Sequence, residues 1–162
     1  MPEALTIINE SGRPKASVTE RLGALGEEIA ARALLDNGYR LVMRNFKVPV
    51  GRNSKGVQVT GEIDIIALEG DTICFVEVKT RRSDEFAPVI AAVDIKKQRQ
   101  ITRTAKMYRR IFELEGRKFR FDVVTVLLPK HSEPVVEIVR SFWDEGKFRK
   151  RRWDHGTSSG HN

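Results

Sequence analysis

Four charged residues interrupt apolar runs in the segment GEIDIIALEGDTICFVEVKTRR, residues 61–82: Glu62 and Asp64 in the first run, Glu77 and Lys79 in the second. A charge inside a buried strand is costly unless it is paired, so these positions need a reason. Paired carboxylates bind hard cations such as Mg²⁺ together with phosphate oxygens of a substrate, and a lysine beside them can orient or deprotonate an attacking water. The pattern therefore indicates metal-dependent hydrolysis of a phosphodiester. The competing interpretation is a surface salt-bridge cluster on a half-exposed hairpin.

The turn between the two runs determines which charged residues face each other. Residues 70–71, Gly-Asp, suit a two-residue hairpin loop with glycine at the first central position. This loop places Asp64 opposite Glu77 and Glu62 opposite Lys79. Opposed residues have Cβ atoms about 4.5–5.5 Å apart, where two like charges are destabilising without a shared proton, a lysine or a cation. Lys79 lies two residues beyond Glu77 and so projects from the same face.

A third acidic residue lies on a predicted helix that precedes the strands. The apolar spacing predicts this helix over residues 20–36, with Thr19 as its N-cap and Asn-Gly at 37–38 ending it. Glu28 has an arginine four residues further on and is typical of a solvated surface pair. Glu27 falls on the shoulder of the buried face, where it can point towards the sheet edge. The alternative is that Glu27 is only a partly exposed charge.

The second predicted helix, residues 94–115, is strongly basic. From Lys96 to Arg110 it carries seven basic residues and no acidic one, whereas a solvated helix normally mixes the signs. The run therefore indicates contact with phosphates. Lys97 and Gln98 lie in the first turns, where they can reach the acidic pair; an ordinary polar helix start is the alternative. We assign nucleic-acid contacts to Lys97, Arg99, Arg103, Arg81 and Arg82.

The other apolar segments supply the rest of a sheet. Strands are expected over residues 39–48, 61–68 and 72–80 and from Phe119 and Val135 onward, with an exposed loop over 49–56. The first three strands can form an antiparallel meander, and the second helix then crosses over to a parallel neighbour. We expect an α/β fold with a mixed sheet flanked by helices. The predicted organisation is a flexible leader (1–17), one domain (18–142) and a flexible basic tail (143–162).

Composition narrows the class of partner. The formal net charge of +7 favours a polyanion, with nucleic acid first and an anionic membrane surface second; a basic protein with no such partner is the alternative. Cys74 is the single cysteine, so no intramolecular disulfide can form. We find no signal peptide, and no window approaches the roughly 18 apolar residues of a membrane span. We expect a cytoplasmic protein without a membrane partner.

Together these motifs resemble the PD-(D/E)xK nuclease superfamily, whose signature is an acid on one strand and acid-x-lysine on the next. Here the signature is Asp64 followed by Glu77-Val78-Lys79. The segments GEEIAARALLDNGYRLVMRN, GEIDIIA and FVEVKTR, with the Lys-Gln pair of the second helix, are similar to the bacterial YraN family of predicted endonucleases. The resemblance covers about residues 22–128 and implies a restriction-endonuclease-like αβββαβ core. Ile63 replaces the superfamily's nominal proline, and residues 46–60 form a longer segment than this family leads us to expect.

The resemblance also implies an activity and a cofactor. It implies a metal-dependent endonuclease acting on branched or structured DNA, with Mg²⁺ or Mn²⁺ bound by Asp64 and Glu77. The Val78 carbonyl would be a further ligand, and Lys79 would position or activate the attacking water.

Two helix residues gain a role from the same resemblance. Holliday-junction resolvases of the superfamily carry a glutamate on the first helix, which Glu27 matches, and several branches carry a glutamine near the site, which Gln98 matches. A two-fold homodimer would suit a symmetric junction. Two other interpretations stay open: a non-catalytic nucleic-acid-binding protein with a nuclease-like fold, and an RNA- or ribosome-associated factor.

Overall fold

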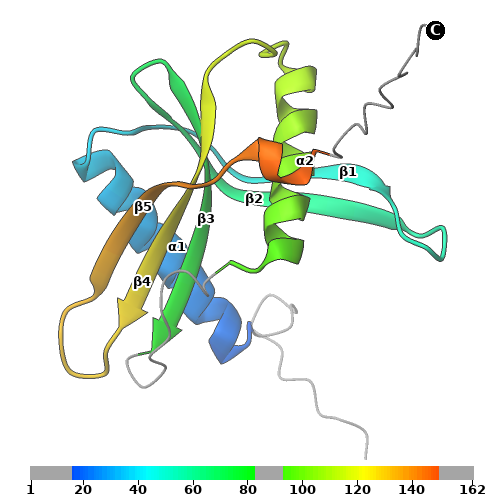
Figure 1. Cartoon of the computed structure of the whole chain (residues 1–162). Coiled ribbons are helices and arrows are strands. Elements are labelled where there is room, and N and C mark those ends of the chain that lie inside the picture. Colours follow the sequence, from blue (N-terminus) through cyan, green and yellow to red (C-terminus); the bar gives the residue numbers. More distant parts are fainter. Residues whose placement is uncertain (1–15, 83–92, 150–162) are drawn as a thin grey trace, which may run out of the picture.

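The structure is a computed structural model that describes residues 16–82 and 93–149. Its elements are α1 (Val18–Asp36), β1 (Arg40–Arg52), β2 (Gln58–Glu69), β3 (Thr72–Arg82), α2 (Ile95–Ile111), β4 (Phe119–Leu128), β5 (Val135–Trp143) and the 3-10 helix η2 (Glu145–Phe148). The strands form one sheet in the order β1-β2-β3-β4-β5, in which β3 and β4 are parallel and the other neighbours antiparallel (Figure 1). The predicted mixed α/β fold, with its αβββαβ element order, is confirmed.

The two long helices cover opposite faces of the sheet (Figure 1). Phe75 of β3 packs in a cluster with Ile101 of α2, whereas the next residue, Val76, packs in a cluster with Leu34 of α1. Side chains alternate across a strand, so a central strand covered on both faces is apolar throughout. Any charged residue in β3 therefore enters one of two hydrophobic cores.

The start of α1 differs by two residues from the prediction. Its N-cap is Ser17 and not Thr19: the Ser17 hydroxyl accepts a hydrogen bond from the Glu20 amide, and the Glu20 carboxylate accepts one from the Ser17 amide. This capping box requires the cap to stand three residues before a Glu or Gln. Ser17 meets that spacing and Thr19 does not, so the Thr19 prediction is wrong.

The end of α2 also differs from the prediction. The helix starts at the N-cap Asp94 as expected but ends at Ile111, with Phe112 as its C-cap, rather than near Gly116. Glu113 adopts a φ of 53°, a left-handed conformation that no α-helix continues through. The helix therefore terminates one turn early.

The predicted loop over residues 49–56 is wrong in its first half, because β1 continues through residues 49–52 as a strand paired with β2. β1 extends to Arg52 and β2 begins at Gln58, so the turn occupies only the residues between them. The Asn53 side chain accepts hydrogen bonds from the amides of Lys55 and Val57 and orders that turn. The ribbon extends to one side of the sheet (Figure 1).

The fold continues past residue 142, where the sequence placed the domain boundary. Trp143 is buried and donates its indole N–H to the Thr102 hydroxyl at 3.0 Å. In η2, Glu145 accepts a hydrogen bond of 2.7 Å from Arg109 of α2. Most of the predicted leader and of the basic tail lies outside the described residues. No helix in the described ranges combines the length and apolar character of a membrane span.

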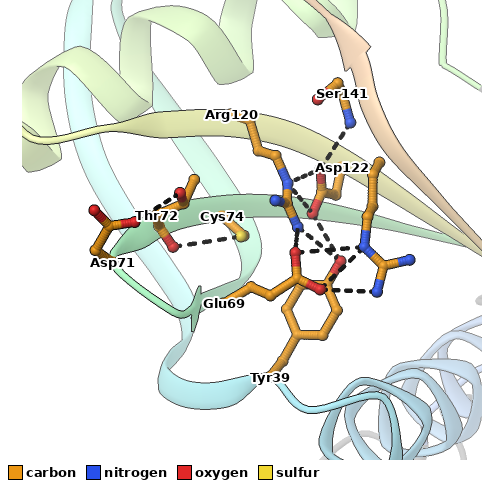
Figure 2. Close-up of polar contacts among 9 residues, drawn as sticks. Tyr39, Glu69, Asp71, Thr72, Cys74, Arg120, Asp122 and Ser141 are labelled. Carbon is orange, nitrogen blue, oxygen red and sulfur yellow. Dashed lines mark hydrogen bonds and ion pairs between the residues drawn. The ribbon is translucent and has the colours of Figure 1, made fainter.

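A closed polar network joins β4 to its surroundings (Figure 2). The fully buried Asp122 carboxylate accepts hydrogen bonds from the Tyr39 hydroxyl (3.1 Å), Arg120 Nε (2.9 Å) and the Ser141 amide (2.9 Å). Arg120 also donates to Glu69. Burial, and then the charge of Asp122, raise the pKa of Tyr39 to about 12, so its hydroxyl keeps its proton and remains a donor. Every member is satisfied, which is the pattern of a structural network.

Candidate active site

The candidate site lies where β2 and β3 separate. Their ladder runs outward from the turn at 70–71 and ends at the pair Ile65–Val76, which confirms the predicted register up to that pair. Beyond it, β2 stays paired with β1 and β3 with β4. The strands thus form a fork, and Asp64 and Glu77 are the first residues past the last paired position.

The fork changes the partners of the next two charged residues. Glu62 was expected to face Lys79, but it pairs across β1 with Lys47 instead, at 3.5 Å between Oε1 and Nζ. Lys79 turns to Glu77 of its own strand. That expectation is wrong because the hairpin ladder does not extend so far.

Asp64 bridges the fork from the β2 side. Its Oδ2 accepts a hydrogen bond of 2.8 Å from the Val78 amide of β3. The carboxylate therefore points towards β3, where it takes the place of a ladder partner. The sequence predicted a role for the Val78 carbonyl as a metal ligand; the contact in the structure involves its amide, which holds Asp64 in place.

Glu77 is the electrostatic centre of the site. Its side chain is only 3% exposed, and its Oε1 lies 3.2 Å from Lys79 Nζ and 3.7 Å from Lys97 Nζ. Among the described residues, Oε2 is buried and has no hydrogen-bond partner. Burial, and then the charge of Asp64, raise the pKa of Glu77 to about 7. The protein thus places a carboxyl group here whose charge it does not fully compensate.

These carboxyl groups fit a hard cation. Two neighbouring carboxylates repel each other unless a proton or a cation lies between them. Within the described ranges, no group of three or more His, Cys, Asp or Glu side chains could hold a metal ion. Mg²⁺ does not need such a cage, because it binds through one or two carboxylates and keeps waters and substrate phosphates as its other ligands. The Glu77 Oε2 atom, which lacks a hydrogen-bond partner among the described residues, and the neighbouring Asp64 carboxylate form a set of oxygen ligands of that type.

Glu27 reaches the same region because α1 crosses β3 very closely. A Cβ added to Gly26 would lie 1.8 Å from Thr80 Oγ1, so a side chain at this position would prevent the approach. Partial burial, and then the charge of Asp64, raise the pKa of Glu27. The neighbouring Glu28 turns away and forms an exposed ion pair with Arg44 at 2.9 Å, in place of the predicted pair within the helix.

A groove of about 520 Å³ separates the first half of α1 from the end of β3. It brings together five of the residues predicted from the sequence, which are Glu27, Val78, Lys79, Arg81 and Arg82. A polyanion entering this groove would meet lysine and arginine side chains next to the acidic pair.

Gln98 does not join this group. It is buried, its Nε2 donates to the Val93 carbonyl at 2.9 Å, and its Oε1 accepts from Lys147 Nζ at 3.2 Å. Among the described residues, no hydrogen bond links it to Asp64 or Glu77. Successive helix residues are about 100° apart, so Lys97 faces the acids while Gln98 faces η2. The sequence placed Lys147 in the flexible basic tail and did not predict its contact with Gln98.

Comparisons with known proteins place the chain in a family. Residues 26–126 match the model of the uncharacterised protein family UPF0102. A UPF0102 protein of Moorella thermoacetica is 39% identical over 121 residues, which cover 74% of this chain and 92% of the relative. One of Syntrophus aciditrophicus is 43% identical over 108 residues, covering 67% and 77%. A solved Holliday junction resolvase of Archaeoglobus fulgidus is 15% identical, with a TM-score of 0.33, and covers 71% of this chain and 75% of that one. The chain belongs to the UPF0102 family, as its resemblance to YraN predicted.

Proposed function

We propose that this protein is a metal-dependent endonuclease that hydrolyses phosphodiester bonds in branched or otherwise structured DNA. The observation that carries the proposal is the buried Glu77 carboxyl group, whose Oε2 has no partner among the described residues although Asp64 stands beside it. A purely structural carboxylate in a core is normally satisfied by donors. Strongly perturbed acids with a defined charge partner are typical of functional sites.

Asp64 and Glu77 would hold Mg²⁺ or Mn²⁺, with the Val78 carbonyl and Glu27 as further oxygen ligands. The bound ion would lower the pKa of a water and neutralise charge on the phosphodiester. Asp64 suits this role because the Val78 amide uses only its Oδ2 and fixes its direction. Glu27 would act at longer range, because it lies on a different element and is only half-buried.

Two lysines would act on the substrate itself. Lys79 and Lys97 approach the same Glu77 oxygen from β3 and α2, so their positive charges stay at the site before any ligand enters. Lys79 would orient the attacking water, and Lys97 would donate to phosphate oxygens as negative charge develops on them. Fixed donors of this kind need no rearrangement during the reaction.

The groove next to the acids would hold the DNA backbone. Arg81 and Arg82 line it together with Lys79, so phosphates on either side of the cut would have positive partners. Substrate class, a homodimer and a cytoplasmic location remain predictions. The second candidate function is a nucleic-acid-binding protein that does not cut DNA or RNA, which the largely exposed basic face of α2 favours.

A cleavage assay tests the proposal. Purified protein is incubated with Mg²⁺ or Mn²⁺ and labelled four-way-junction, flap, duplex and single-stranded DNA, beside the variants Asp64→Asn and Lys79→Ala. Asp64→Asn keeps an oxygen for the Val78 amide but removes the charge. We expect each variant to lower the cleavage rate by about 10² to 10⁴. Binding without cleavage under either metal would contradict the enzyme proposal and favour the second candidate.

The matched control is Lys118→Ala, which removes one lysine charge just before the start of β4, where Lys118 pairs with the exposed Asp71 near the hairpin turn. This variant should cut at the wild-type rate. If Lys79→Ala also cuts at that rate, the activity belongs to a contaminating nuclease or to another site, and our assignment of Lys79 is wrong.

A further inference from the structure

A second groove lies on the far side of α2, between that helix and η2. Its volume is about 760 Å³, and Figure 1 shows η2 beside α2. Its lining includes Arg99, Arg103, Lys106, Arg110, Phe148 and Arg149. The acid pair lies elsewhere, under the opposite side of the first turn of α2, where Lys97 contacts Glu77.

The groove carries a surplus of positive charge. Four cations, Arg99, Arg103, Lys106 and Arg110, form no ion pair with a described acidic residue. Of the two acids in the lining, Glu145 is already bound to Arg109 (2.7 Å) and Arg149 (3.5 Å), which leaves Glu115. Uncompensated cations along one helix face are the electrostatic footprint of a phosphate backbone.

The second wall of the groove is held in place by side chains. Lys147 of η2 donates to Gln98, and Glu145 accepts from Arg109, whose guanidinium lies 3.7 Å from the centroid of the Phe119 ring. Arg109 is mostly buried, so this anchor belongs to the fold rather than to a surface contact. These contacts give the buried Gln98 a positioning role, because it fixes η2 against α2.

An aromatic ring completes the groove. Phe148 is half-buried, and the guanidinium carbon of Arg99 lies 5.6 Å from its ring centroid. Basic grooves that also contain an aromatic platform are typical of sites for single-stranded nucleic acid, because any base can stack on the ring while the cations follow the phosphates. A duplex keeps its bases stacked on each other and would leave the ring unused.

We propose that the groove between α2 and η2 binds a single strand of nucleic acid, with phosphates along the α2 cations and a base against Phe148. The proposed function supplies the class of partner, but the inference does not require that the protein cut DNA. Adjacent residues of α2 connect the two sites: Lys97 contacts Glu77 and Gln98 holds η2. A strand anchored in the groove would therefore lie close to the start of α2.

Fluorescence anisotropy in EDTA tests this site without cleavage. The full chain is titrated against a labelled single strand of about 15 nucleotides and a duplex of the same sequence. The variant Arg103→Ala/Lys106→Ala is compared with Arg21→Ala/Arg32→Ala, which removes the same charge from exposed positions of α1. We expect a loss of affinity of about tenfold or more for the groove variant, with a salt slope reduced by about 1.4, and a change of less than about threefold for the control.

Phe148→Leu separates stacking from charge and should weaken single-strand binding about fivefold or more, with little effect on the duplex. Equal losses in the two double variants would overturn the groove as a site. Tighter binding of duplex than of single strand, or an unchanged Phe148→Leu affinity, would overturn the single-strand assignment.

Cleavage by the wild-type protein distinguishes this inference from the proposed function. Binding that depends on the groove, without any cleavage, rejects only the nuclease. Cleavage together with binding that does not depend on the groove rejects only this inference.

Discussion

Two buried carboxylates on neighbouring strands have opposite environments. Asp122 of β4 is paired in register with Val76, the residue before Glu77 of β3. Asp122 is fully buried and accepts hydrogen bonds from three partners on three segments of the chain. Glu77 is 3% exposed, yet its Oε2 has no donor among the described residues, and its pKa is raised to about 7.

This difference in hydrogen bonding distinguishes a carboxylate that stabilises the fold from one that can take part in chemistry. A buried acid with all donors in place stabilises one arrangement of the chain. A buried acid with one oxygen left without a hydrogen-bond partner costs free energy, and such a cost persists at sites where a ligand supplies the missing partner. Burial alone therefore does not distinguish the two roles, but the number of satisfied oxygens does.

The largest loss of stability is expected from removing the Asp122 carboxylate. Asp122→Ala leaves Arg120, the Tyr39 hydroxyl and the Ser141 amide without their acceptor. Breaking a buried ion pair in this way costs about 3–5 kcal/mol of the free energy of unfolding. Urea denaturation measures it, and a loss below about 1 kcal/mol would contradict the structural role of the network.

The corresponding substitution of Glu77 should raise the free energy of unfolding instead of lowering it. The pKa of Glu77 is raised to about 7 in the folded protein from an ordinary value near 4.5, so the folded state is most stable while Glu77 is protonated. Stability is then lost as the pH rises from about 4.5 through about 7. Glu77→Gln should remove this loss and be about 3 kcal/mol more stable than wild type at pH 8 in EDTA, with little gain at pH 4.5. Equal pH dependence of urea unfolding in both proteins would show that Glu77 is compensated.

Sequence reasoning found one of these carboxylates and missed the other. Asp122 interrupts an apolar strand just as Asp64 and Glu77 do, so the local pattern is the same. Its partners Tyr39 and Ser141 come from distant segments of the chain, and no local sequence pattern predicts that they meet. The hairpin register was predictable because the turn at 70–71 is local.

Other errors have the same origin. The polar, glycine-containing segment 49–56 has the composition of a loop, but residues 49–52 pair with β2 and belong to a strand. Gln98 and Lys97 are neighbours in the sequence, and only the position of η2 shows that they serve different sites. Fold class and the acid-acid-lysine set were accessible from the sequence, whereas the environments of the acids were not.

Two glycines of α1, Gly26 and Gly23, test whether the close crossing of α1 over β3 positions Glu27 at the site. Gly26→Ala places a methyl group against Thr80 and should cost about 1–3 kcal/mol of stability, because overpacking moves the helix. It should also slow cleavage, since Glu27 moves with α1. Gly23→Ala meets nothing within 4 Å and should stabilise the helix by about 0.5–1 kcal/mol, with a smaller change in cleavage than Gly26→Ala. Equal effects of the two variants, measured by thermal unfolding and cleavage rate, would rule out the close crossing.

The smallest effect concerns the two adjacent glutamates of α1. Glu27→Gln should lower the cleavage rate about tenfold or less, because Glu27 acts on the site only from its margin. Glu28→Gln removes the exposed ion pair with Arg44 and should leave the rate unchanged, with a stability change below about 1 kcal/mol. A greater loss of activity in Glu28→Gln than in Glu27→Gln would show that the orientation of α1 is misassigned.

The most direct measurement is the single-turnover rate of DNA cleavage by wild type and Glu77→Gln in Mg²⁺, on the substrate that wild type cuts best. Glu77→Gln keeps the shape of the side chain and should be the more stable protein at neutral pH, so unfolding cannot explain a loss of rate. We predict a rate lower by about 10³ or more. Cleavage by Glu77→Gln at the wild-type rate would contradict the account, because the buried Glu77 carboxylate would then have no part in the chemistry.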